Sequence, residues 1–117
     1  RAVMAQARRA TDLPQQVQEV VDRIVEGYDP EKIIIFGSFA CGTWTDESDL
    51  DLLVIKDTDE RWLDRVVEVS GLCTPRLLSM DIIVSTPREV RDALAHRELF
   101  MREVMREGVV AYERQRE

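Results

Sequence analysis

The sequence predicts an α/β domain of two layers, in which helices pack on one face of a three- to four-stranded mixed sheet. Short runs rich in leucine and β-branched residues, each bounded by turn residues, alternate along the chain with longer segments of helical periodicity. The chain has 117 residues, which is enough for one domain and one core. Apolar residues make up 44% of it, so much of the chain must be buried and disorder is disfavoured.

Helices are predicted where apolar residues recur three and four positions apart. The first helix extends from about Pro14 to Gly27, and one of its faces is rich in valine and isoleucine. The second opens at Asp57, which together with Glu60 resembles a capping box, and it ends at Gly71. Its inward-facing residues are predicted to be Trp62, Leu63, Val66 and Val67.

The last helical region has a strong start signal. Thr86 supplies a hydroxyl cap, a proline follows it, and Glu89 lies at the third helical position. The helix is expected to break near His96, which we interpret as a surface residue, and to continue to Gly108. Its apolar stripe after the break consists of Phe100, Met101, Val104 and Met105.

Strands are predicted at short apolar runs between these helices. Three of them are β-branched or leucine-rich, and a fourth short strand closes the chain. They cover residues 32–36, 50–55, 80–84 and 109–112. We expect residues 1–13 to form an N-terminal arm and residues 14–117 to form the folded domain.

Charge is unevenly distributed along the chain. The formal net charge is −7, which argues against general nucleic-acid binding because that function needs a basic face. Nine acidic and only three basic residues lie between Asp46 and Glu68. This acidic centre indicates a cation site, although a solvated helix face accounts for its later part, from Asp59 onward.

The cellular setting is inferred from what the sequence lacks. No segment is apolar over the roughly 20 residues that a membrane span needs, and the first ten residues, with three arginines, do not form a signal peptide. Cys41 and Cys73 are not spaced like metal ligands, so reduced thiols are the simpler interpretation. We therefore expect a cytoplasmic protein that does not bind membranes.

Three aspartates stand at the starts of predicted strands. Asp49 and Asp51 are two residues apart, so strand alternation places both on one face, with Cα atoms roughly 6.5 Å apart. Asp81 is the single charge in residues 79–84. If the two strands are neighbours the three carboxylates converge, and they could hold two divalent ions about 4 Å apart, for which oxygen ligands favour Mg²⁺ or Mn²⁺. The alternative is that Asp49 and Asp51 are turn and cap residues and that Asp81 is exposed at an edge.

A segment of small residues follows the first predicted strand. Gly37 ends that strand, and Ser38 opens a helical turn whose free N–H groups form an anion site. The glycine lets a phosphate approach closely, and the serine hydroxyl adds a donor. A Gly-Ser pair alone is usually only a turn, but here it precedes the paired aspartates by ten residues.

Gly-Ser, ten residues and then Asp-x-Asp resembles the signature of the DNA polymerase β-like nucleotidyltransferase superfamily. The chain is similar to its smallest members, the minimal nucleotidyltransferases, over about residues 14–112, and its ending from Glu107 to Tyr112 is also similar to theirs. The resemblance implies the polymerase β-like nucleotidyltransferase fold. One position departs from the pattern: Cys41 stands where the family usually has arginine. A thiol supplies neither a fixed charge nor a guanidinium fork, so we expect a lower nucleotide affinity or rate.

The resemblance also implies a reaction and a role for each site residue. Gly37 and Ser38 would hold the triphosphate of ATP. Asp49 and Asp51 would ligate two Mg²⁺ ions, and Asp81 would ligate the ion beside the attacking hydroxyl and help to deprotonate it. AMP would pass from ATP to that hydroxyl and pyrophosphate would leave.

The family further implies a partner. Minimal nucleotidyltransferases are commonly paired with a HEPN-domain ribonuclease, so this chain would be the antitoxin of a type VII-like toxin–antitoxin pair that AMPylates a tyrosine of the HEPN toxin. Exposed apolar residues near Phe39, Trp44 or the last helix would fit such a contact. In so short a chain we expect another subunit, in a homo- or hetero-oligomer, to supply the acceptor surface. The alternatives are an adenylyltransferase with a small-molecule acceptor such as an aminoglycoside, and a catalytically decayed module that masks the HEPN partner.

Overall fold

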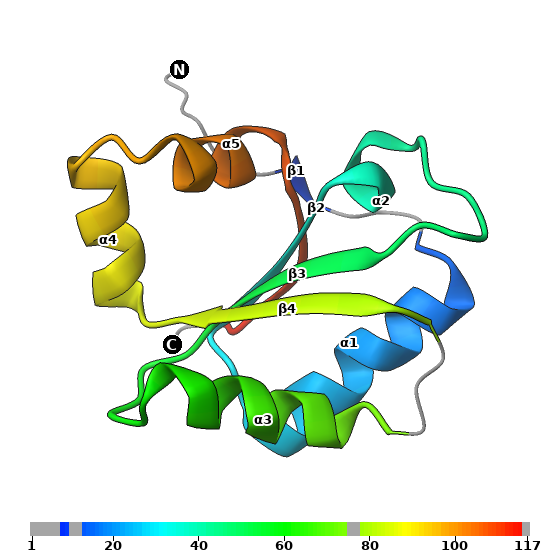
Figure 1. The fold of residues 1–117 in the computed structure, drawn as a ribbon. Helices are drawn as coiled ribbons and strands as arrows, with labels where there is room; N and C mark the ends of the chain where they lie inside the picture. Colours follow the sequence, from blue (N-terminus) through cyan, green and yellow to red (C-terminus); the bar gives the residue numbers. More distant parts are fainter. Residues whose placement is uncertain (1–7, 10–12, 75–77, 116–117) are drawn as a thin grey trace.

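One mixed sheet runs through the part of the chain that the computed structural model describes, which is residues 8–9, 13–74 and 78–115 (Figure 1). Its strands are β1 (Arg8–Arg9), β2 (Lys32–Phe36), β3 (Leu50–Ile55), β4 (Met80–Ser85) and β5 (Val109–Glu113). They lie in the order β1-β5-β2-β3-β4. The outer pairs β1–β5 and β3–β4 are parallel, and β2 is antiparallel to both of its neighbours.

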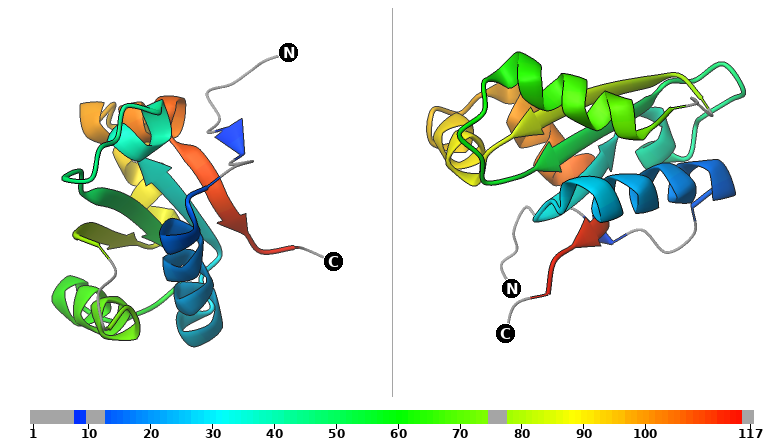
Figure 2. Two further views of the ribbon diagram at one scale, coloured as in Figure 1. Left: turned by 90° about the vertical axis from the view of Figure 1, so that its right-hand side faces the viewer. Right: turned by 90° about the horizontal axis from the view of Figure 1, so that it is seen from below.

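Helices cover both faces of this sheet. They are α1 (Gln15–Tyr28), α2 (Ser38–Cys41), α3 (Trp62–Leu72), α4 (Pro87–Ala95) and α5 (Leu99–Glu107). Helices α1 and α3 pack on one face, while α4 and α5 pack on the other, as the left view of Figure 2 shows. The predicted α/β class and mixed sheet are therefore confirmed, but helices lie on two faces and not on the single face that we expected.

Unbroken apolar runs in the central strands explain the second helical layer. Ile33, Ile34 and Ile35 are all fully buried, and successive side chains of a strand point to opposite faces. Ile33 and Ile35 join the cluster under α1 and α3, whereas Ile34 joins the cluster under α4 and α5. Leu52 and Leu53 divide in the same way. A strand with apolar residues at consecutive positions needs a cover on both sides.

The first helix extends one residue beyond its predicted end. Gly27 lies inside α1, and Asp29, in the left-handed conformation with φ 53°, ends the helix. A β-carbon at Gly27 would overlap the side chain of Leu72. The glycine therefore lets α3 pack closely against α1 and does not act as a stop signal.

The third helix differs most from the prediction. It begins after Arg61, so the capping box predicted at Asp57 and Glu60 is wrong. Of the four residues predicted to face inward, only Val66 packs against the core. The other three are mostly exposed: Trp62 at 59%, Leu63 at 58% and Val67 at 63%.

A buried arginine occupies the inner face of α3 instead. Arg65 is only 6% exposed, and its guanidinium donates to both carboxylate oxygens of Glu89, at 2.8 and 3.2 Å. It also donates to the backbone oxygens of Val84 and Glu60. Every nitrogen of the buried charge thus has an acceptor, as burial of a charge requires. Because β4 is an outer strand, the contact with Val84 also occupies part of a sheet edge that another strand could otherwise extend.

The end of the chain agrees with the prediction. Thr86 and Glu89 form the predicted capping box of α4, with reciprocal bonds of 3.0 and 2.9 Å. The helix breaks at an exposed His96, α5 begins at Leu99, and β5 follows Gly108. Within the part of the chain that the structure describes, no helix has the length and apolar character needed to cross a membrane.

The predicted N-terminal arm can be followed only in part. Residues 1–7 and 10–12 of this arm lie outside the described residues. Residues 8 and 9 form β1, which pairs with Val109 and Val110 at the start of β5. This short strand has no signal in the sequence, since two arginines form no apolar pattern.

Candidate functional site

The turn after β2 is built around a glycine that no other residue could replace without strain. Gly37 has φ 77° and ψ −151°, a conformation almost restricted to glycine. Its carbonyl oxygen accepts bonds from the N–H groups of Ala40 and Cys41, which form the first turn of α2. A β-carbon at position 37 would overlap the carboxylate of Asp51. The Gly-Ser turn and the aspartate pair, separate in the sequence, are thus in direct contact.

The register of the strands also places Asp81 beside Asp51. Asp51 lies opposite Phe36 in β2 and opposite Asp81 in β4. The neighbours Leu50 and Leu52 point to the α1 and α3 face, so Asp51 points to the face of α4 and α5. Strands 50–55 and 80–84 are therefore neighbours, as predicted, and they place Asp51 beside Asp81.

The charges of neighbouring carboxylates act on Asp51. Burial raises the pKa of Asp51, and the negative charges of Asp81 and Asp49 raise it further. A hydrogen bond with the Asp81 side chain raises the pKa of Asp51 further, because it favours the protonated form of Asp51. Asp49 is exposed just before β3, and Asp81 is exposed on β4, so solvent and ligands can reach both. The site is an open, negatively charged edge of the sheet.

This arrangement suits a divalent cation in its donor chemistry. Carboxylate oxygens are preferred by Mg²⁺, and a cation would remove the repulsion that raises the pKa of Asp51. Among the described residues, however, no three His, Cys, Asp or Glu side chains are already gathered closely enough to hold a metal ion. Asp51 and Asp81 already lie side by side on neighbouring strands. Asp49 is the nearby carboxylate that would complete a set of metal ligands.

A small cavity beside the Gly-Ser turn brings α5 next to Gly37 and Cys41, a contact that the sequence did not indicate. Its volume is about 170 Å³, and its walls come from the end of β2, from α2 and from α5. Its lining residues are Phe36, Gly37, Cys41, Phe100, Glu103, Val104 and Glu107. The rings of Phe36 and Phe100 meet edge to face with centroids 5.5 Å apart. No spacing rule links these residues, because the cavity forms only when α5 folds back over β2.

The aromatic residues expected near the site are partly exposed. Phe39 in α2 and Trp44 in the following loop stack with centroids 5.2 Å apart, and Trp44 is 43% exposed. On α5, Leu99 is 69% and Phe100 is 47% exposed. Apolar side chains are therefore exposed to solvent in the loop after α2 and on α5.

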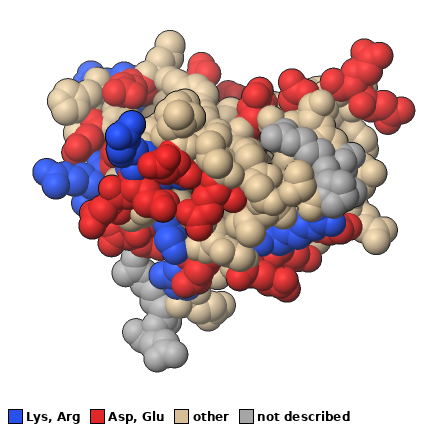
Figure 3. All heavy atoms as spheres, turned by 60° about the horizontal axis from the view of Figure 1, so that its bottom comes forward, with Lys and Arg blue, Asp and Glu red and all other residues tan. Residues whose placement is uncertain are grey.

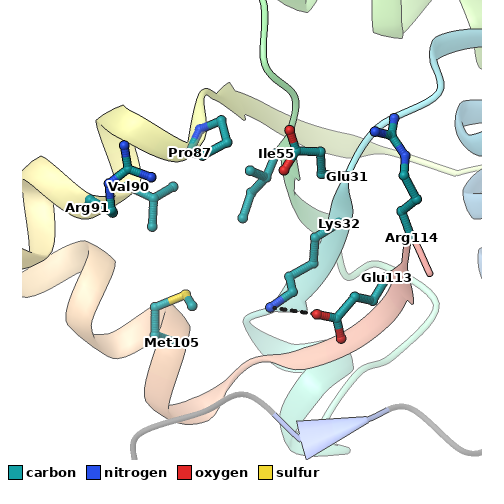
Figure 4. A pocket seen from close by; sticks show the side chains of 9 residues that line it. All are labelled: Glu31, Lys32, Ile55, Pro87, Val90, Arg91, Met105, Glu113 and Arg114. Atoms are coloured by element: carbon teal, nitrogen blue, oxygen red, sulfur yellow. Dashed lines mark ion pairs between the residues drawn. The ribbon is translucent and has the colours of Figure 1, made fainter. Parts of the chain in front are cut away.

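A larger cavity lies at the other end of the sheet (Figure 4). It measures about 590 Å³, and Figure 4 shows Val90 and Arg91 projecting into view from α4, Met105 from α5, and Lys32 paired with Glu113. Lys32 is opposite Ile55 in the strand register, whereas Phe36 is opposite Asp51, so the length of β2 separates this cavity from the carboxylates. The larger cavity is therefore not part of the aspartate site.

Known proteins resemble this chain in sequence and in fold. Residues 18–117 match the family Polymerase beta, Nucleotidyltransferase. A "putative protein adenylyltransferase" of Methanocaldococcus jannaschii is 38% identical over 85 residues, which cover 70% of this chain and 78% of that protein. The crystal structure of a "putative nucleotidyltransferase" from Sulfolobus solfataricus is similar with a TM-score of 0.60 and 24% identity, over 86% of this chain and 79% of the other. At that identity, the second likeness concerns the fold alone.

The family match extends over the Gly-Ser turn, the aspartate pair, β4 and the closing strand. The structure joins the first three of these elements at one edge of the sheet. This chain belongs to the polymerase β nucleotidyltransferase family of enzymes.

Proposed function

We propose that this protein transfers AMP from ATP to a hydroxyl group of another protein, most simply a tyrosine of a HEPN ribonuclease toxin, and so acts as an antitoxin. The observation that carries the proposal is the contact of Gly37 with Asp51, beside Asp81, at one open edge of the sheet. A phosphate-binding turn next to paired carboxylates is the arrangement that nucleotidyl transfer needs. The 38% identity to a protein named as an adenylyltransferase supports the choice of AMP.

In this proposal each site residue has one task. The backbone N–H groups after Gly37 and the hydroxyl of Ser38 would hold the triphosphate. Asp81, exposed at the sheet edge, would accept the proton of the attacking hydroxyl. The new bond joins that oxygen to the α-phosphorus of ATP, and the bond from the α-phosphorus to the bridging oxygen breaks to release pyrophosphate. Positioning of the two reactants would supply much of the rate.

Two Mg²⁺ ions belong to the same proposal. Asp49 and Asp51 would hold both ions, and Asp81 would hold the ion nearer the attacking hydroxyl. When bound, the ions neutralise phosphate charge and orient the entering and leaving oxygens. The raised pKa of Asp51 supports a cation there, since burial and like charges destabilise the ionised form without one.

The acceptor would approach over the exposed apolar residues beside the site. Phe100 contacts Phe36, the residue opposite Asp51, and a protein partner would cover Phe100 together with the exposed Leu99 and Trp44. Reaction in the cytoplasm fits the two cysteines, neither of which forms a disulfide. Homo- or hetero-oligomers would both allow a second subunit to complete the acceptor surface.

The test uses the neighbouring gene product, ATP labelled in its α-phosphate, and MgCl₂. We expect label on a tyrosine of the HEPN partner, detected by mass spectrometry as added AMP. Asp81→Asn should lose transfer much more than it loses ATP binding, whereas Asp51→Asn should weaken ATP binding itself. Equal ATP affinity in wild type and Asp51→Asn, measured by calorimetry with MgCl₂, would contradict the site assignment. Transfer at the full rate by Asp81→Asn would contradict its role as proton acceptor.

One observation favours a second candidate. Cys41, in place of the family's arginine, lies exposed on the cavity beside Gly37 and offers no charge to a phosphate. A non-catalytic module that masks the HEPN partner would bind that partner but leave its mass unchanged. Complex formation without AMP addition would therefore select this alternative, and transfer to an aminoglycoside instead of a protein would select a small-molecule acceptor.

A further inference from the structure

The outer surface of α3 carries large apolar side chains that the fold leaves uncovered. Trp62, Leu63 and Val67 are 59%, 58% and 63% exposed, respectively. Together they present roughly 300 Å² of apolar side chain to water, which is the size of the largest such patch on a typical monomer. Leu63 and Val67 are one helical turn apart and lie in line, and Trp62 borders Leu63 at the start of the helix, about 100° around its axis. We call these three residues the α3 stripe.

Acidic residues lie directly beside this stripe. Asp64 and Glu68 follow Leu63 and Val67 by one position each, so they form a second row that borders the stripe about 100° further around the helix. Partial desolvation and the carboxylates of Glu68 and Asp64 raise the pKa of Glu60, which precedes the helix. Figure 3 shows the surface on which α3 lies, where acidic side chains gather beside a broad uncharged area.

The position of the stripe separates it from the aspartate site. Helix α3 packs with α1 on one face of the sheet through Val69, whereas Asp51 points to the opposite face. Gly71, at the other end of the exposed side of α3, has open space where a side chain would be. A partner segment could thus lie along the whole helix without covering the carboxylates.

We propose that the α3 stripe is a docking site for a protein helix whose apolar face is bordered by lysine or arginine. The apolar side chains of such a helix would cover Trp62, Leu63 and Val67. Its cations would pair with Asp64, Glu68 and Glu60, which already crowd one another. A second copy of this chain is a poorer match, because its own acids would face the acids of the first. The proposal does not depend on the adenylyl-transfer activity.

The test uses a synthetic helical peptide with leucine on one face and lysine beside it. Binding is followed by the fluorescence of Trp62 in a Trp44→Phe background and by calorimetry. We expect the peptide to shift the Trp62 emission to shorter wavelength and to bind more weakly as salt is raised. The double variant Leu63→Gln/Val67→Gln should bind at least about tenfold more weakly, because central apolar contacts carry most of the binding energy.

Matched controls distinguish this site from general attraction to an acidic protein. Leu99→Gln removes an exposed leucine from α5 and should bind the peptide like wild type. Asp64→Asn/Glu68→Gln should reduce both affinity and salt dependence. The same peptide with glutamate in place of lysine should not bind. Equal binding of the lysine peptide to wild type and to Leu63→Gln/Val67→Gln would overturn the proposal. Dimerisation of the wild type that this double variant abolishes in sedimentation would also overturn it, since the occupant would be a second copy.

Discussion

The carboxylate of Asp51 occupies the space that a β-carbon at Gly37 would need. This contact joins Asp51 of β3 to the turn after β2. It fixes the distance between the Gly-Ser turn and the aspartates. It also means that Gly37 is required for two reasons, since its backbone has a glycine-specific conformation as well. The position of Asp51, a candidate catalytic residue, therefore depends on the absence of a side chain at Gly37.

Gly37→Ala is expected to lower both stability and function. Strain of about 1 to 3 kcal/mol should reduce the Tm by several degrees, and displacement of Asp51 should reduce AMP transfer by about 100-fold. Gly42→Ala is the matched control, because Gly42 has the same φ of 77° but nothing within 4 Å of its would-be β-carbon. It should lose about 1 kcal/mol of stability and little activity. Equal losses of transfer in the two variants would show that the contact with Asp51 does not matter.

Asp51→Asn is expected to raise stability when no divalent cation is present. The folded state holds the pKa of Asp51 above its usual value, so its ionisation destabilises the fold as pH rises through the folded-state pKa. At neutral pH in EDTA, the variant should have a Tm higher by roughly 2 to 5 °C. The gain should vanish at acid pH, where the wild-type carboxyl is protonated in both states. Thermal unfolding between pH 3 and 8 measures this.

The same variant should respond differently to a cation. MgCl₂ should raise the wild-type Tm, because the ion binds the folded state and relieves the repulsion, and it should have little effect on Asp51→Asn. Asp57→Asn removes an exposed carboxylate elsewhere in the acidic segment and should follow the wild type. An equal rise in Tm for wild type and Asp51→Asn would place the bound cation elsewhere.

Most of the fold could be predicted because its signals are local. Apolar runs bounded by turn residues located the strands, and Thr86 with Glu89 located the start of α4. The approach of Asp51 to Asp81 was also predictable, because each is the only charged residue of an otherwise apolar strand and lies near its start. The sequence also contains a signal for helices on both faces of the sheet, because three consecutive isoleucines in β2 cannot all point to one face.

The orientation of α3 could not be predicted in the same way. Periodicity assigns apolar residues to the inner face, so it selected Trp62 and Leu63 and passed over a charged residue. Arg65 is inside because Glu89, 24 positions later, and the carbonyl of Val84 accept its hydrogen bonds. A pairing between distant residues has no local pattern. The place of Phe100 and Glu103 beside the Gly-Ser turn could not be predicted for the same reason.

Glu89→Gln tests the ion pair between the buried Arg65 and Glu89 that sets this orientation. The hydrogen bond from Arg65 holds the pKa of Glu89 below its ordinary range, so its stabilising contribution is present above that range and is lost as pH falls through the folded-state pKa. Because the Glu89 side chain is half exposed, we expect a loss of only about 1 kcal/mol at neutral pH. The loss should shrink as pH falls below 4. Glu26→Gln, at an exposed position of α1, should leave the free energy of unfolding unchanged, and a similar effect of both substitutions would contradict this account.

Cys41→Arg should restore the charge that the family usually has beside the Gly-Ser turn. The new guanidinium would share its cavity with Glu103 and Glu107, which would hold it in place but would also offset part of its charge. We therefore expect an increase of about tenfold in affinity for ATP with MgCl₂, the effect of roughly 1.4 kcal/mol, as measured by calorimetry. Cys41→Lys supplies a point charge without the planar fork and should gain less, and Cys41→Met should gain nothing. If all three variants bind ATP as the wild type does, the thiol does not limit nucleotide binding, and the low charge at this position has no functional consequence.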